Sequence, residues 1–79
     1  MKLTALFSYS PNVEYSPMER EIESTIFRKG KMVSVTPELR SVLNAERISV
    51  NQNTTVLAFE NYVMVNSGED STVFSVDKE

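Results

Sequence analysis

Residues 54–76 read TTVLAFENYVMVNSGEDSTVFSV, and this stretch decides the fold class. It contains three short runs rich in β-branched and aromatic residues, at 54–59, 62–65 and 72–76. Such runs, separated by polar turn residues, are typical of β-strands joined by hairpins. At the tightest connection, Glu60-Asn61, the asparagine is expected to adopt the positive φ of the second turn position. The C-terminal part of the chain therefore predicts an antiparallel meander.

Three further segments N-terminal to the meander have strand character. Residues 2–9 alternate between two phases, one of them fully apolar or aromatic, which predicts a strand with one buried side. Residues 32–35 and the pair Ile48 and Val50 are shorter β-branched stretches. Together with the meander, these segments predict a sheet of four to six short strands.

A first helix is predicted over residues 17–29. Ser16 can accept a hydrogen bond from the backbone of Glu19, whose carboxylate can reach back to Ser16, so the two residues form a capping box. Pro17 occupies the first helical position, where its missing N–H costs nothing. Gly30 follows the helix and is expected to supply a left-handed residue at its end.

A second helix is predicted over residues 37–45. Thr36 is its expected N-cap, and Pro37 again occupies the first helical position. One face of this helix carries apolar side chains at helical spacing, namely Leu39, Val42 and Leu43. It is therefore expected to pack on the sheet through that face.

The order of these elements predicts an α+β fold. We expect a single small domain over residues 1–79, with two helices packed on one face of a largely antiparallel sheet. The chain is 41% hydrophobic and has a net charge of −3, which favours one small folded core. It has no Cys and no His, which excludes disulfides and imidazole or thiolate metal sites, and makes self-association an available source of stability.

The same absences argue against an enzyme, because His is the usual general base near neutral pH and Cys is the strongest common nucleophile. Two glycines, Gly30 and Gly68, cannot build a Gly-rich phosphate-binding loop. We interpret Glu19, Glu21 and Glu23 as acidic complements of the helix dipole rather than as metal ligands. We therefore expect no catalytic residues, no cofactor and no metal.

The N-terminus begins like a signal peptide, but the polar residues Ser8, Ser10 and Asn12 interrupt it before an apolar stretch of the required length can form. No apolar run approaches the ~18 residues that a membrane-spanning helix needs. We therefore expect a cytoplasmic protein that makes no contact with a membrane.

These observations favour a small non-enzymatic protein-binding domain, of inhibitor or modulator type, that occludes a surface of a partner protein. The helix at 17–29, an exposed strand edge and the acidic C-terminal region are the expected contact surfaces. Residues 60–79 carry five acidic and one basic side chain, so a basic partner surface is expected. Small acidic chains of this kind are common among accessory proteins of phages and mobile elements. The candidate contact residues are Glu69, Asp70, Asp77, Tyr62 and Tyr15.

Two alternatives remain open. The first is a nucleic-acid-binding module that uses the basic cluster at 28–31 and two later arginines, with Arg28, Lys29, Lys31, Arg40 and Arg47 as its contacts. A helix C-terminus also attracts cations, which accounts for the cluster without any nucleic acid. The second is a structural subunit of a larger assembly, or a homodimer formed through an exposed strand edge.

Overall fold

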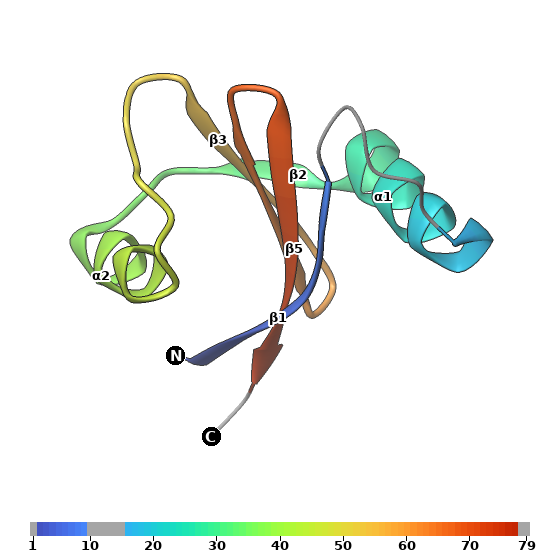
Figure 1. Ribbon diagram of the computed structural model, residues 1–79, viewed down its shortest axis with the longest axis horizontal. Coiled ribbons are helices and arrows are strands. Elements are labelled where there is room, and N and C mark those ends of the chain that lie inside the picture. The colour runs from blue at the N-terminus through green and yellow to red at the C-terminus, as the bar shows by residue number, and fades with distance from the viewer. Residues whose placement is uncertain (1, 10–15, 78–79) are drawn as a thin grey trace.

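One antiparallel sheet forms the centre of the computed structural model, which describes residues 2–9 and 16–77 (Figure 1). Its strands are β1 (Lys2–Tyr9), β2 (Lys31–Val33), β3 (Thr54–Phe59), β4 (Tyr62–Ser67) and β5 (Asp70–Asp77). They lie in the order β1-β5-β4-β3-β2, and all neighbouring strands are antiparallel. The predicted α+β class, the single antiparallel sheet and the C-terminal meander are therefore confirmed.

The two hairpins of the meander turn through left-handed residues. The β3–β4 turn lies at Glu60-Asn61, as predicted, but the positive φ belongs to Glu60, at 53°, and not to Asn61. A two-residue hairpin loop needs a left-handed residue at its first central position to match the twist of the strands, which explains the difference. At the β4–β5 turn, Gly68 has a φ of 62° and meets the same need without a side chain.

Helix α1 (Pro17–Lys29) begins at the predicted capping box. The N–H of Glu19 donates to Oγ of Ser16 at 3.2 Å, and the N–H of Ser16 donates to Oε1 of Glu19 at 3.1 Å. Its end differs from the prediction, because Gly30 has extended backbone, with φ −68° and ψ 152°. The chain enters β2 at the next residue and so must already be extended there. Glycine is needed for space, since a Cβ would collide with the carbonyl oxygen of Ile26.

Helix α2 (Pro37–Ala45) begins at Thr36, whose hydroxyl accepts a hydrogen bond from the N–H of Leu39 at 3.1 Å, as predicted. Ile48 and Val50, which were expected to form a strand, lie instead in the loop between α2 and β3. Both side chains pack, partly buried, against the core beneath α2. Their apolar character therefore serves to close that core rather than to add a strand.

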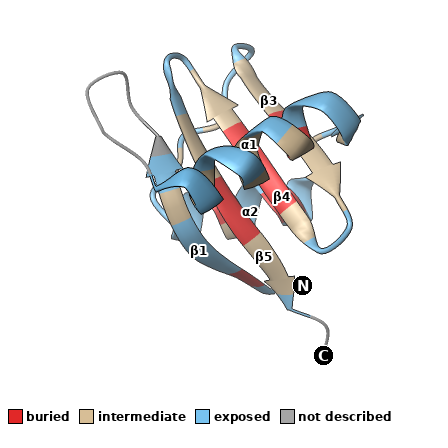
Figure 2. Ribbon diagram, turned by 90° about the vertical axis from the view of Figure 1, so that its right-hand side faces the viewer, coloured by how far each residue is buried: buried red, intermediate tan, exposed pale blue. Residues whose placement is uncertain are grey.

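The two helices lie on opposite faces of the sheet, rather than on one face as expected (Figure 1). Ile26 of α1 packs with Met64 and Val73, whereas Leu43 of α2 belongs to a separate cluster that includes Val65. Figure 2 shows α1 crossing the sheet over buried parts of β4 and β5. The meander strands carry apolar residues at consecutive positions, so both of their faces need a cover. The molecule therefore has three layers.

β1 and β2 are the two edges of the sheet, and they differ in kind. The register between β1 and β5 shifts between Ala5 and Phe7, which leaves Leu6 as an extra residue, 46% exposed. A bulge of this kind discourages further pairing at an edge. β2 has only three residues, and all of them are exposed. The short edge strand β2 is therefore the more regular of the two edges.

Candidate functional site

The acidic and aromatic residues expected to contact a partner do not form one surface. Glu69 and Asp70 lie at the β4–β5 turn, whereas Asp77 is at the far end of β5, about 23 Å away along an extended strand. Tyr62 begins β4 and is half-buried beneath α1, against the core of that face. Tyr15 lies outside the described residues. The predicted acidic surface is thus divided between two ends of the sheet.

The five basic residues proposed for nucleic acid are also divided. Arg28 and Lys29 lie in the last turn of α1, and Lys31 begins β2, so these three exposed residues are neighbours in the chain. Arg40 belongs to α2, on the other face, where its Nη1 donates to the carbonyl of Val50 at 3.5 Å. The cluster at 28–31 is therefore a local feature and not part of a larger basic surface.

Arg47 and Asp70 line the same hollow, of about 220 Å³, on the α2 face of the sheet. Arg47 was expected to bind nucleic acid and Asp70 to bind a basic partner, yet both residues line this hollow. Opposite charges at one site weaken the field that either would present to an approaching ligand. This placement argues against Arg47 as a separate contact for nucleic acid and against Asp70 as a separate contact for a basic partner. Arg47 also has a positive φ of 65°, which it adopts one residue after the C-cap of α2, Glu46.

A groove begins at the β2 edge on the α1 face and runs across β3 and β4 to the β4–β5 turn, and we call it the edge groove. It has a volume of about 540 Å³, and its apolar lining comes from Phe27 of α1, Met32 of β2 and Leu57 of β3. Phe27 is 59% exposed and Met32 is 74% exposed. Asn66 and Ser71, hydrogen-bonded to one another, add a polar part to the lining, and Glu69, one of the predicted partner contacts, lines it as well. The edge groove is thus an apolar hollow with a polar end.

A second hollow of about 540 Å³ flanks the same edge on the α2 face, and we call it the rear hollow. Val33, Val35 and Val56 contribute to its apolar lining. Successive residues of a strand point to opposite faces, so Met32 and Val33 present their side chains on the two sides of the sheet. The β2 edge is therefore accompanied by a hollow on each of its faces.

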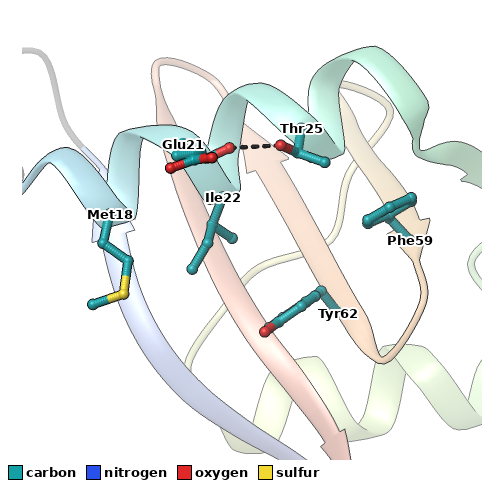
Figure 3. A pocket seen from close by; sticks show the side chains of 6 residues that line it. All are labelled: Met18, Glu21, Ile22, Thr25, Phe59 and Tyr62. Carbon is teal, nitrogen blue, oxygen red and sulfur yellow. Dashed lines mark hydrogen bonds between the residues drawn. The ribbon is translucent and has the colours of Figure 1, made fainter.

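A smaller pocket lies between the N-terminal half of α1 and the β3–β4 hairpin, and we call it the α1 pocket (Figure 3). Its volume is about 200 Å³. Figure 3 shows the side chains of Met18 and Ile22 extending from the helix toward the sheet, with Phe59 and Tyr62 on the strands opposite. Glu21 and Thr25 complete the lining. Tyr62 is therefore the one described residue of the predicted aromatic and acidic contact set that lines this pocket.

Among residues 2–9 and 16–77, no group of three acidic side chains is placed to hold a metal ion. Neither of the two described helices has both the length and the apolar character needed to cross a membrane. No protein-family model matches this sequence, and neither the curated proteins nor the solved structures contain a significant match to it. A function for this chain is therefore inferred from the grooves, charges and exposed side chains of its surface.

Sequence reasoning did not select Phe27 and Met32 as contact residues. A usable signal was present, because Phe27 lies one position after Ile26 and so falls beside the buried stripe of α1 rather than within it. In the sequence, Met32 is part of a short β-like stretch that carries no sign of a contact role. Its exposure depends on β2 being the edge strand, and strand order cannot be read from one sequence of short runs.

Proposed function

We propose that this chain is a non-enzymatic protein-binding domain that binds an extended segment of a partner protein at the β2 edge. The observation that carries the proposal is the pair of hollows on the two faces of this edge, each of about 540 Å³. An added strand places alternate side chains on alternate faces of a sheet. Its side chains would therefore enter the edge groove and the rear hollow in turn, while its backbone pairs with β2.

The exposed apolar side chains support the same mode of binding. Phe27 and Met32 are 59% and 74% exposed, although side chains of this size are usually covered. Aromatic and Met side chains are enriched at protein interfaces, where a few buried anchors supply most of the binding energy. Phe27 and Met32 are the expected anchors here.

Three cations near the edge groove, against the one carboxylate of Glu69 in its lining, support an acidic character for the bound segment. Arg28, Lys29 and Lys31 are exposed and adjacent to Phe27 and Met32 in the chain. Complementary charges steer association and select partners. The proposed ligand is therefore an extended segment with apolar residues at alternate positions and an acidic residue nearby. At the β2 edge, an acidic partner segment is therefore proposed in place of the basic partner surface expected from the overall composition.

Under this proposal the domain acts by covering the bound segment, which makes it an inhibitor or modulator of its partner. We further propose that it does so in the cytoplasm. A strand bound at an edge is removed from other interactions, because its backbone groups and alternate side chains are already engaged.

The test begins with peptides selected from a displayed random library against the purified protein. A selected peptide should be extended, apolar at alternate positions and acidic, and NMR should show shifts at the amides of residues 31–33. Met32→Glu should weaken its binding at least about tenfold, a loss typical of an interface anchor. Leu6→Glu is the matched control, because Leu6 is an exposed apolar residue on the opposite edge.

Two outcomes contradict the proposal. Equal losses with Met32→Glu and Leu6→Glu would show that binding does not depend on the β2 edge. A dimer in sedimentation equilibrium that Met32→Glu dissociates would assign the edge to a second copy of the chain instead. In that case the homodimer or assembly-subunit alternative replaces the partner segment.

One observation favours nucleic acid as a second candidate. Phe27 is exposed beside Arg28 and Lys29, and aromatic stacking next to cations is how single strands are commonly bound. The discriminating measurement is the salt dependence of binding to a single-stranded oligonucleotide. Nucleic-acid binding predicts a steep salt slope that falls when Lys29→Gln and Lys31→Gln are combined. Protein binding predicts no measurable affinity for the oligonucleotide at physiological salt.

A further inference from the structure

The α1 pocket combines aromatic rings with a carboxylate that has no partner among the described residues. Phe59 and Tyr62 supply the rings, and they come from strands that meet at one hairpin (Figure 3). Glu21 supplies the carboxylate, and its side chain makes no hydrogen bond or ion pair within residues 2–9 and 16–77. The hydrogen bond drawn beside it in Figure 3 is made by its backbone carbonyl, which accepts from Thr25 Oγ1 at 2.8 Å.

This combination has a specific chemical preference. The face of an aromatic ring carries partial negative charge and attracts a cation held within about 6 Å of its centre. A guanidinium can stack on such a ring and also donate to a carboxylate through its planar fork. Met18 and Ile22 offer apolar contacts for the aliphatic part of a long side chain. The lining thus matches a basic side chain along its whole length.

Size excludes a larger ligand. The pocket has a volume of about 200 Å³ and is open to solvent. Clefts that hold cofactors or drug-sized molecules are larger, at about 300–1,000 Å³. A single side chain that enters from a partner surface is therefore the appropriate occupant.

The surrounding charges favour a cation as well. Glu60, an exposed residue that does not itself line the pocket, lies in the turn between Phe59 and Tyr62 and adds a second negative charge at this end of the hairpin. The positive end of a helix dipole acts mainly within the first turn. Here that turn already engages the Glu19 carboxylate in the capping box. Arg20, the neighbouring cation on α1, does not line the pocket.

We propose that the α1 pocket is a recognition site for a basic side chain, arginine above all, presented by a partner protein. The inference deepens the proposed function, since it names a second chemical feature of the partner. It concerns a different place on the α1 face, however, because the pocket lies under the N-terminal half of α1 and the edge groove lies beside Phe27, in the last turn of the helix. The two sites can therefore be tested separately.

The test uses N-acetyl-arginine amide as a probe, titrated into isotope-labelled protein and followed by NMR. N-acetyl-citrulline amide is the control, because it has nearly the same shape and no charge. Saturable shifts at Thr25, Phe59 and Tyr62 with the arginine probe are the expected result. The citrulline probe should bind at least about fivefold more weakly, which is the size of one cation–aromatic contact.

A matched pair of variants distinguishes the pocket from general electrostatic attraction. Glu21→Gln should weaken arginine binding about fivefold, whereas Glu23→Gln, which removes the same charge from the same helix outside the pocket, should not. Phe59→Leu should weaken binding as well, with Phe27→Leu as its control. Equal binding of the two probes, or equal effects of Glu21→Gln and Glu23→Gln, would overturn the proposal.

The result is independent of the β2 edge. Met32→Glu should leave arginine binding unchanged, because Met32 does not line the α1 pocket. If peptide binding at the edge fails while the arginine probe binds, the proposed function is wrong and the basic side-chain site stands. The reverse result removes the site and leaves the proposed function intact.

Discussion

Met64 and Val65 are neighbours in β4, yet they are buried in separate cores on opposite faces of the sheet. Met64 is fully buried with Ile26 of α1, and Val65 is 2% exposed in the cluster that contains Leu43 of α2. A chain of 79 residues thus divides its apolar side chains between two thin layers. Each helix depends on its own layer for most of its stability.

The division can be tested by hydrogen exchange. Met64→Ala should lower the free energy of unfolding by about 2–5 kcal/mol and speed amide exchange in α1 more than in α2. Leu43→Ala should have a similar cost but the opposite preference, since Leu43 is fully buried beneath α2. If both variants speed exchange equally in the two helices, the cores are not separate units.

The β3–β4 turn predicts a stabilising substitution. Glu60 has a φ of 53°, a conformation that costs a residue with a Cβ roughly 1–2 kcal/mol. Glu60→Gly should therefore raise the free energy of unfolding by about 0.5–1 kcal/mol after the entropy of glycine is counted. Chemical denaturation measures the change. Asn61→Gly is the control and should give no comparable gain, because Asn61 does not have a positive φ.

In contrast to Glu60→Gly, a substitution of Gly30 is expected to lower the free energy of unfolding. A Cβ at this position would collide with the carbonyl oxygen of Ile26, which is backbone and cannot rotate away. Gly30→Ala should therefore cost about 1–3 kcal/mol of stability. Gly68→Asn should cost little, because Gly68 has open space around it and Asn tolerates its left-handed backbone. Equal losses at the two glycines would contradict this account.

Substitutions of the two proposed anchors, Phe27 and Met32, should weaken peptide binding without changing the stability of the fold. Phe27→Ser and Met32→Ser should each change the free energy of unfolding by less than about 0.5 kcal/mol, since both side chains are mostly exposed. The same variants should lose binding to a selected peptide. A loss of more than about 1 kcal/mol of stability would instead give these residues a structural role.

Local features of the fold could be predicted because their causes are local. The capping box of Ser16 and Glu19 needs only residues three apart, and the hairpin at Glu60-Asn61 needs only two polar residues between apolar runs. The consecutive apolar residues Val63, Met64 and Val65 are a weaker indication that the helices lie on opposite faces, because such a run needs cover on both faces of the sheet.

The candidate site was harder to predict because it depends on strand order. Met32 is exposed because β2 has no neighbour on its outer side, and no residue in β2 itself encodes that position. The acidic residues were grouped by their closeness to the C-terminus. Asp70 and Asp77 are the first and last residues of the eight-residue strand β5, so closeness in sequence did not become closeness in space.

The pairing of β1 with β5 also determines how the chain must be made. Lys2 pairs with Asp77, so β1 leaves the ribosome well before its partner strand β5 has been made. Contacts between such distant residues slow folding, because the loop between them must close first. During synthesis β1 therefore waits with its edges unpaired, and its apolar residues Leu3, Leu6 and Phe7 are without the cover that the folded sheet gives Leu3.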